Sequence, residues 1–317
     1  GTVARGRLGG LVAGLGFVLP GLLMVLLASW LLQGSQPLPP MVLAAFAGMQ
    51  CVVVALVARA AWRLGKSVIV ADSTLWPVLL AAAALSFLQA PFWVTLVGGG
   101  VYAALHGRPL LRLMMLPIWG LVGLSLTTSG LPAPDPEATL HLATAPDPTQ
   151  LAASGLRAGL LTFGGAYTAI PFLQQDAVGP HGWMTLAEFQ DGLAVSGMIP
   201  SPLIVFGAWV GWAGGGLGGA LLVAVAIFLP AFILPLLLHD VLERIAAAPR
   251  LHRLLEGVTA AVCGMIGEVA LQWTLQLDAP WRWGTAAAAW LVLARVGHRL
   301  VVLPLMAAAA AIGFVAA

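Results

Sequence analysis

Residues 161–176, LTFGGAYTAIPFLQQD, place two adjacent glycines, a proline and several polar side chains inside a very apolar chain. The chain is 60% hydrophobic and 8% charged, about a third of the charged fraction of a typical soluble domain. Several uncharged runs are long enough to cross a hydrocarbon core of about 30 Å as helices. The alternation expected of membrane β-strands is missing from the sequence. These features predict an all-α, polytopic integral membrane protein.

Apolar runs predict about 11 helical segments. They lie near residues 8–32, 41–61, 74–90, 91–106, 110–131, 151–173, 189–212, 217–238, 252–273, 281–297 and 299–317. Arg59, Arg63 and Lys66 follow the second segment, whereas the loop at 33–40 has no basic residue. Because basic residues favour cytoplasmic loops, we expect the loop at 33–40 and the proline-rich linker at 132–150 to lie outside.

Two pairs of similar sequences indicate an internal duplication. LVAGLGFVLPG at 11–21 resembles LLVAVAIFLPA at 221–231, and residues 47–61 align with 256–270 at nearly the same offset. The basic residues predict opposite orientations for the two halves, as in the inverted-topology repeats of many secondary transporters. We therefore expect a first repeat at 1–131, an extracytoplasmic linker at 132–150 and a second repeat at 151–317.

The same offset places the counterpart of residues 151–210 before Gly1. We therefore expect the chain to be truncated at its N-terminus and to lack the first two helical segments of its first repeat.

Gly164, Gly165 and Pro171 predict a discontinuous helix in the opening stretch, and Pro200 and Pro202 predict a second break at residues 196–202. Irregular backbone at membrane depth is tolerated where it is buried in protein or lines a wet cavity. Helix N-termini exposed at such breaks can bind an anion. The alternative is that the glycines only allow close helix packing.

These breaks resemble the signature region of the chromate ion transporter family. Its members share an FGG motif, here residues 163–165, and a GW-(L/M)-T-x-x-E-F-x-D-G stretch, here residues 182–192. Where the family pattern of the second break is close to G-Q-x-T-P-G-P, this chain has Gly197 and Ile199 at the glutamine and threonine positions. Residues 16–21 and 47–66 resemble later parts of the family's first half. The resemblance implies chromate efflux across the bacterial-type cytoplasmic (inner) membrane, with sulfate as a structural mimic.

The predicted substrate-binding residues combine the two breaks with one arginine. They are Arg157, Phe163, Gly164, Gly165, Tyr167, Thr168, Ser196, Pro200, Ser201 and Pro202. An intramembrane arginine is costly, so a role facing an oxyanion is one interpretation of Arg157, and snorkelling to the interface is the other.

Three carboxylates are candidates for ion coupling. Asp191 lies inside an apolar run and is the stronger proton-relay candidate, whereas Glu188 also fits a capping box with Thr185. Glu268 lies within the predicted segment 252–273, where an acidic side chain is expensive, unless it reaches the outer interface.

The favoured function is a secondary transporter that exports an oxyanion, with chromate as the first candidate substrate. A sulfate or other anion transporter and a passive anion channel are the alternatives. No phosphate-binding loop, nucleophile with its base, or HExxH motif occurs in the sequence, so we expect neither an enzyme nor a metal or other cofactor. The expected partners are the oxyanion and the lipid bilayer, not nucleic acid, and a homodimer is left open.

Overall fold

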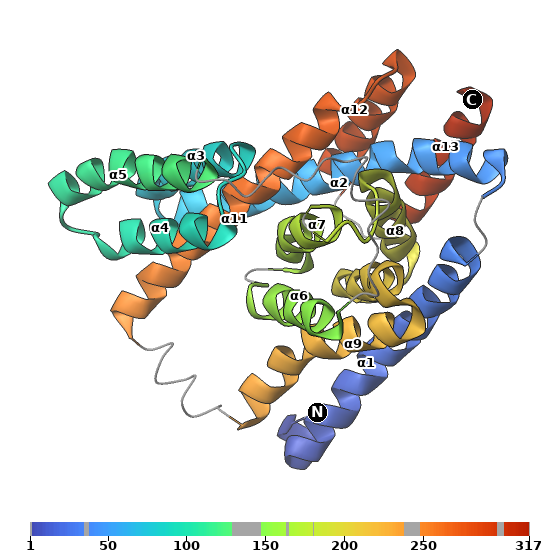
Figure 1. The fold of residues 1–317 in the computed structure, drawn as a ribbon, viewed down its shortest axis with the longest axis horizontal. Helices are drawn as coiled ribbons and strands as arrows, with labels where there is room; N and C mark the ends of the chain where they lie inside the picture. The colour runs from blue at the N-terminus through green and yellow to red at the C-terminus, as the bar shows by residue number, and fades with distance from the viewer. Residues whose placement is uncertain are drawn as a thin grey trace.

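The computed structural model describes residues 2–34, 38–128, 147–162, 165–179, 181–237, 248–296 and 301–316. Its described helices are α1 (Thr2–Gln33), α2 (Pro40–Ala71), α3 (Trp76–Phe87), α4 (Phe92–Ala104), α5 (Pro109–Thr128), α6 (Pro148–Leu160), α7 (Ile170–Val178), α8 (Leu186–Met198), α9 (Gly207–Leu237), α11 (Pro249–Leu275), α12 (Pro280–Arg295) and α13 (Val302–Ala316). Three 3₁₀ segments, η1 (Ser73–Leu75), η3 (Ala166–Ala169) and η4 (Leu203–Phe206), connect them (Figure 1). The prediction of an all-helical chain is confirmed. Most of the predicted linker at 132–150 lies outside the described residues.

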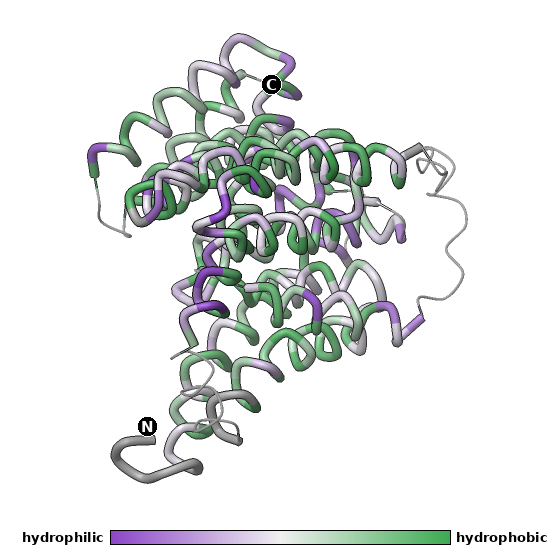
Figure 2. Tube along the Cα trace, turned by 90° about the vertical axis from the view of Figure 1, so that its left-hand side faces the viewer, coloured by the Kyte–Doolittle hydropathy of each residue, from purple (hydrophilic) through white to green (hydrophobic). Residues whose placement is uncertain are grey.

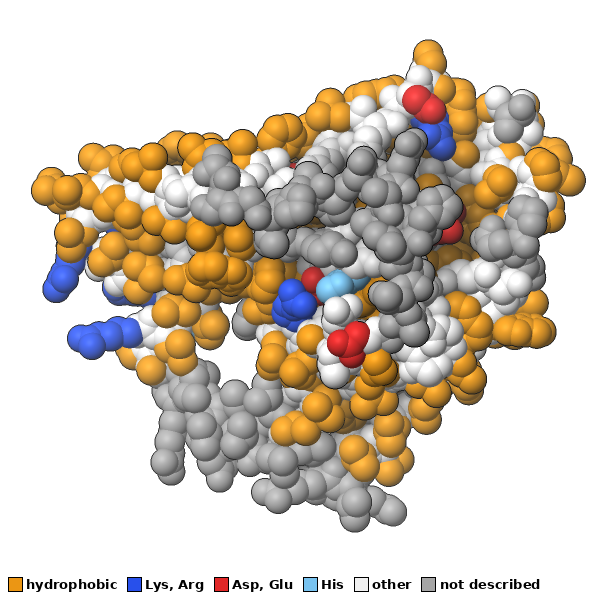
Figure 3. Space-filling view, viewed as in Figure 1, with side chains coloured by type: hydrophobic (Ala, Val, Ile, Leu, Met, Phe, Trp, Pro, Cys, Tyr) orange, Lys and Arg blue, Asp and Glu red, His pale blue; other side chains and the backbone are white. Residues whose placement is uncertain are grey.

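Five apolar stretches are long enough to cross a membrane. They are Gly9–Gln33, Pro40–Val70, Pro109–Thr127, Leu203–Ile233, which is interrupted at Gly215 and Gly216, and Pro249–Leu275. Hydrophobic residues run along most of the helical path (Figure 2), and hydrophobic side chains cover much of the surface that faces the viewer in Figure 3. A water-exposed monomer rarely carries so much apolar surface, whereas acyl chains solvate it without cost. The chain is therefore a multi-span membrane protein.

Helices α2 and α11 pack side by side along the middle of the molecule (Figure 1). Helices α3 and α4 pack against α11, and α12 and α13 pack against α2. Glycines set these crossings, because a Cβ atom at Gly257 of α11 would overlap the carbonyl oxygen of Gly99 in α4. A Cβ atom at Gly48 of α2 would likewise overlap the carbonyl oxygen of Ala309 in α13. Such close backbone approach is typical of helix pairs in membranes.

The predicted segments at 151–173 and 189–212 differ from single spanning helices. The first divides into α6, a break and η3 with α7, and the second divides into α8, a break at 199–202 and η4 with α9. Both segments are discontinuous, as the sequence predicted. The 13 residues of α6 cover only about 20 Å, less than the hydrocarbon core.

Each broken segment doubles back as a hairpin. A Cβ atom at Gly214 would touch both Leu151 at the start of α6 and Trp183 after α7, so both ends of the first hairpin lie together. Helix α9 consists of two parts, because Gly215 and Gly216 inside it are not helical. Gly214 ends the first part, and the chain reverses at Gly216, which has a positive φ of 58°. At the opposite end η3 contacts η4, so the tips of the two hairpins meet.

Candidate functional site

The tip of the first hairpin is built around Gly165. Its φ of 143° is one that residues with a side chain rarely adopt. The fully buried Thr168 hydroxyl donates a 2.7 Å hydrogen bond to the Gly165 carbonyl oxygen and thereby closes η3. Tyr167 is half-buried beside it. The predicted site residues Phe163 and Gly164 lie outside the described residues.

The tip of the second hairpin carries two serines. The amide of Ser201 donates to the Ile199 carbonyl oxygen at 2.7 Å, and Pro202 directly precedes η4. The buried hydroxyl oxygens of Ser196 and Ser201 have no hydrogen-bond partner among the described residues. Pro200 is exposed. Buried hydroxyl groups without partners are available to a polar ligand.

The start of η3, which continues into α7, and the start of η4 come together where the tips meet. No side chain caps the start of η3, of α7 or of η4. The first amide groups of these turns point along the positive end of each helix dipole. Helix α1 covers the second tip so tightly that a Cβ atom at Gly21 would overlap the Ser201 side chain. The predicted break residues are therefore brought together, with α1 packed over them.

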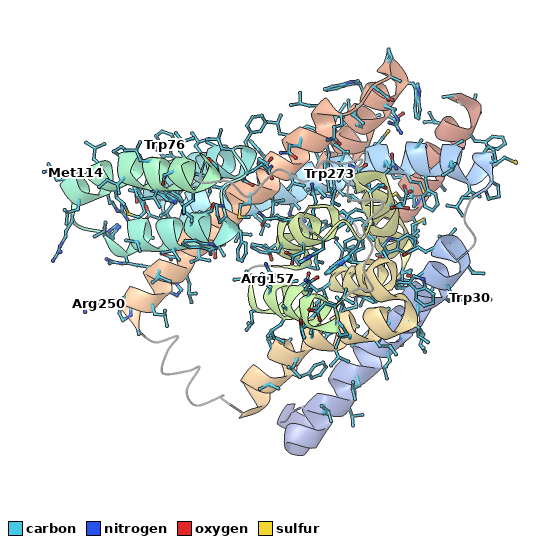
Figure 4. The ribbon with its side chains drawn as sticks, in the orientation of Figure 1. Trp30, Trp76, Met114, Arg157, Arg250 and Trp273 are labelled. Atoms are coloured by element: carbon cyan, nitrogen blue, oxygen red, sulfur yellow. The ribbon has the colours of Figure 1, made fainter. Side chains whose placement is uncertain are left out.

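Arg157 forms an ion pair that the sequence reasoning missed. Its Nη1 atom lies 3.2 Å from Oδ1 of Asp176 in α7, and its guanidinium lies 5.4 Å from the centre of the Phe92 ring. Arg157 projects from α6 toward α7 (Figure 4), and basic, acidic and histidine side chains gather over these helices in Figure 3. The missed signal was the aspartate in the opening stretch, since an intramembrane arginine needs a countercharge.

His181 lies in the turn between α7 and α8, close to this ion pair. Its ring stacks on Trp183 with 4.8 Å between ring centres. Burial lowers the pKa of His181, and the nearby Asp176 carboxylate opposes that shift while Arg157 adds to it. The neutral imidazole is therefore favoured in the folded protein.

Asp191 and Glu188 both line a pocket of about 250 Å³ between α1, α2, α8 and α9. The predicted capping box is confirmed, because the Thr185 hydroxyl accepts from the Glu188 amide and Glu188 accepts from the Thr185 amide at 2.7 Å. Asp191 is 8% exposed, and its Oδ1 atom accepts a 2.7 Å hydrogen bond from Gln50 Nε2 of α2. No pattern in the sequence predicted the role of Gln50 as this partner.

Glu268 occupies a different part of the molecule, between α11 and α3. It is 5% exposed, and its Oε2 atom accepts a 2.9 Å hydrogen bond from the Ser86 hydroxyl. Its Oε1 atom has no partner among the described residues. In the part of the chain that the structure describes, no three His, Cys, Asp or Glu side chains form a metal-ligand group.

Comparison with known proteins identifies related sequences. The family model described as "Chromate transporter" matches residues 1–104 and 149–314. A chromate transport protein of Pseudomonas aeruginosa is 42% identical over 272 residues, which cover 86% of this chain and 65% of that protein. A probable chromate transport protein of Synechococcus elongatus is 28% identical over 84% of this chain and 66% of its own length. A chromate transport protein of Cupriavidus metallidurans is 27% identical over 81% and 63%.

The chain thus spans slightly less than two thirds of the length of these relatives. No solved structure matches it. The family model covers most of the chain, including both hairpins and the central helices α2 and α11. The chain belongs to the chromate transporter family, a family of membrane transporters and not of enzymes.

Proposed function

We propose that the protein is a secondary transporter that exports chromate across the inner membrane, with the substrate held where the hairpin tips meet. The observation that carries the proposal is the contact between η3 and η4, two uncapped helix starts. Opposed helix N-termini at midplane are a recurrent way to bind an anionic group in transporters. The orphan hydroxyl groups of Ser196 and Ser201 and the Tyr167 side chain would add donors to an oxyanion.

The proposal includes two inverted-topology repeats. Helices α1 and α9 pack together, as do α2 and α11. In the two proposed repeats, α2 corresponds to α11, α3 to α12 and α4 to α13. Helices α3 and α4 pack on α11, and their counterparts α12 and α13 pack in the same way on α2, the counterpart of α11. The two glycine contacts are also equivalent in the two repeats. Gly48 contacts Ala309 and Gly257 contacts Gly99, and Gly48 corresponds to Gly257 and Gly99 to Ala309 at sequence offsets of 209 and 210. This agreement supports a duplication at the level of single contacts.

The transport cycle that we propose uses Asp191 as the proton-binding group, with Glu188 beside it in the same pocket. A carboxylate that is buried next to a pocket can bind a proton on one side of the membrane and release it on the other. Glu268 would act as a second intramembrane carboxylate on the α3 side of α11. Coupling of this kind would drive export against a chromate gradient.

Flux through vesicles tests the function. The full-length protein is reconstituted into liposomes, and chromate movement is measured with and without a proton gradient. We expect saturable flux that the gradient drives and that sulfate inhibits by competition. Asp191→Asn should leave the rate of chromate exchange unchanged but abolish its dependence on the proton gradient. Unsaturable flux that follows only the electrochemical gradient would indicate a passive channel, and the failure of both anions to move or compete would refute the proposed substrate class.

A further inference from the structure

A chain of polar side chains runs from the pocket to the turn between α11 and α12. Gln50 Nε2 of α2 donates to Asp191 Oδ1 at 2.7 Å, and the amide oxygen of Gln50 accepts from Nη2 of Arg282 at 3.2 Å. Arg282 Nη1 lies 3.1 Å from Oδ1 of Asp278, which is 76% exposed. Gln50 therefore connects α8 to α12 through α2.

The arginine fixes which way the Gln50 amide points. A guanidinium only donates hydrogen bonds and stays charged at every physiological pH, so it selects the oxygen of the amide. The NH₂ group of Gln50 is thereby aimed at Asp191. A donor in this position, polarised by a cation behind it, stabilises the ionised carboxylate. The 2.7 Å separation is typical of hydrogen bonds to a charged group.

Other groups oppose this effect. Asp191 is 8% exposed, and burial disfavours its charged form. Glu188 lies three residues earlier on the same helix and borders the same pocket, so its negative charge also disfavours ionisation. Arg282 is the cation that acts on Asp191, and the two pocket residues of α1, Leu32 and Gln33, are uncharged.

We propose that Gln50 and Arg282 are positioning residues that favour the ionised form of Asp191 against the effect of burial and so set the pH at which it takes up a proton. This inference rests on the proposed role of Asp191 in ion coupling. It adds that helices of the first repeat (α2) and of the second repeat (α12) jointly control that role. Asp278 would keep the Arg282 fork oriented.

Infrared spectroscopy tests the proposal without relying on transport. The C=O band of protonated Asp191, assigned by its loss in Asp191→Asn, is titrated in the full-length protein in lipid nanodiscs from about pH 4 to about pH 10. Gln50→Leu removes a hydrogen bond to a charged group and should raise the midpoint by about one pH unit or more. Arg282→Leu should raise it in the same direction, and Arg282→Lys should restore part of the shift.

Gln33→Leu is the matched control, because Gln33 borders the same pocket but its amide donates to the Trp209 carbonyl oxygen at 3.2 Å. Its midpoint should equal that of the unmodified protein. Equal midpoints for Gln50→Leu and Gln33→Leu would overturn the proposal, and so would the lack of an Asp191 band in all variants. If the band shifts as expected but chromate does not move in vesicles, the inference about Asp191 stands and the proposed substrate fails.

Discussion

The ion pair between Arg157 and Asp176 makes a quantitative prediction, because its two members differ in burial. Asp176 is 8% exposed, and its Oδ2 atom has no hydrogen-bond partner among the described residues, whereas Arg157 is 32% exposed. Removing one partner of a fully buried pair costs about 3–5 kcal/mol. Arg157→Gln leaves the buried carboxylate without its arginine, and we expect a loss of about 2–3 kcal/mol, reduced because solvent screens the pair and Asp176 can take up a proton.

Asp176→Asn leaves a partly exposed arginine that can extend toward the interface, so its cost should be about 1 kcal/mol. The double variant leaves no charge buried and should also lose about 1 kcal/mol, which gives a coupling free energy of about 2–3 kcal/mol. The free energy of unfolding is measured by titrating the purified protein with denaturing detergent in mixed micelles. Asp278→Asn is the matched control, because it removes an exposed aspartate from an Arg–Asp pair and should change stability by less than about 0.5 kcal/mol.

If Asp176→Asn destabilised the protein as much as Arg157→Gln, or if the two losses simply added in the double variant, the buried carboxylate would not be the member of the pair that depends on its partner. Flux separates a structural role from substrate binding. If Arg157 only joins α6 to α7, the stable double variant transports chromate, and if it also contacts the oxyanion, that variant is stable but inactive. Asp176→Asn should then retain transport, because it frees the guanidinium.

Two further predictions concern packing and pH. Gly257→Ala forces α11 away from the Gly99 carbonyl oxygen and should destabilise the protein by about 1–3 kcal/mol, whereas Gly267→Ala on the same helix has open space and should be neutral or slightly stabilising. Equal thermal midpoints for the two variants would contradict the described crossing. Burial lowers the pKa of His181, so the stability it contributes is complete above the unfolded value of about 6.5 and is lost as the pH falls below it. The unfolding midpoint should therefore drop between about pH 7.5 and about pH 5, less steeply in His181→Gln, and an unchanged slope in that variant would exclude His181 as the cause.

The sequence by itself determined the class of the protein and the positions of its irregular segments. Composition and uncharged runs predict a helical membrane protein, because only helices and closed β-barrels satisfy the backbone in lipid, and the sequence lacks the alternation of barrel strands. Gly165 and the prolines at 200 and 202 mark the two breaks, since few residues other than glycine adopt the φ of Gly165 and a proline has no N–H group to continue a helix. The capping box of Thr185 and Glu188 was also predictable, because its hydrogen bonds join residues only three positions apart.

Only the tertiary structure decided where the chain goes after each break and which charges meet. A glycine or proline permits a change of direction but does not fix it, and contacts such as that of Gly214 with Leu151 turn the predicted spans into hairpins. Gln50 meets Asp191 across 141 positions and Arg282 across 232. Local periodicity carries no information about contacts at such separations, because they arise when whole helices pack against each other.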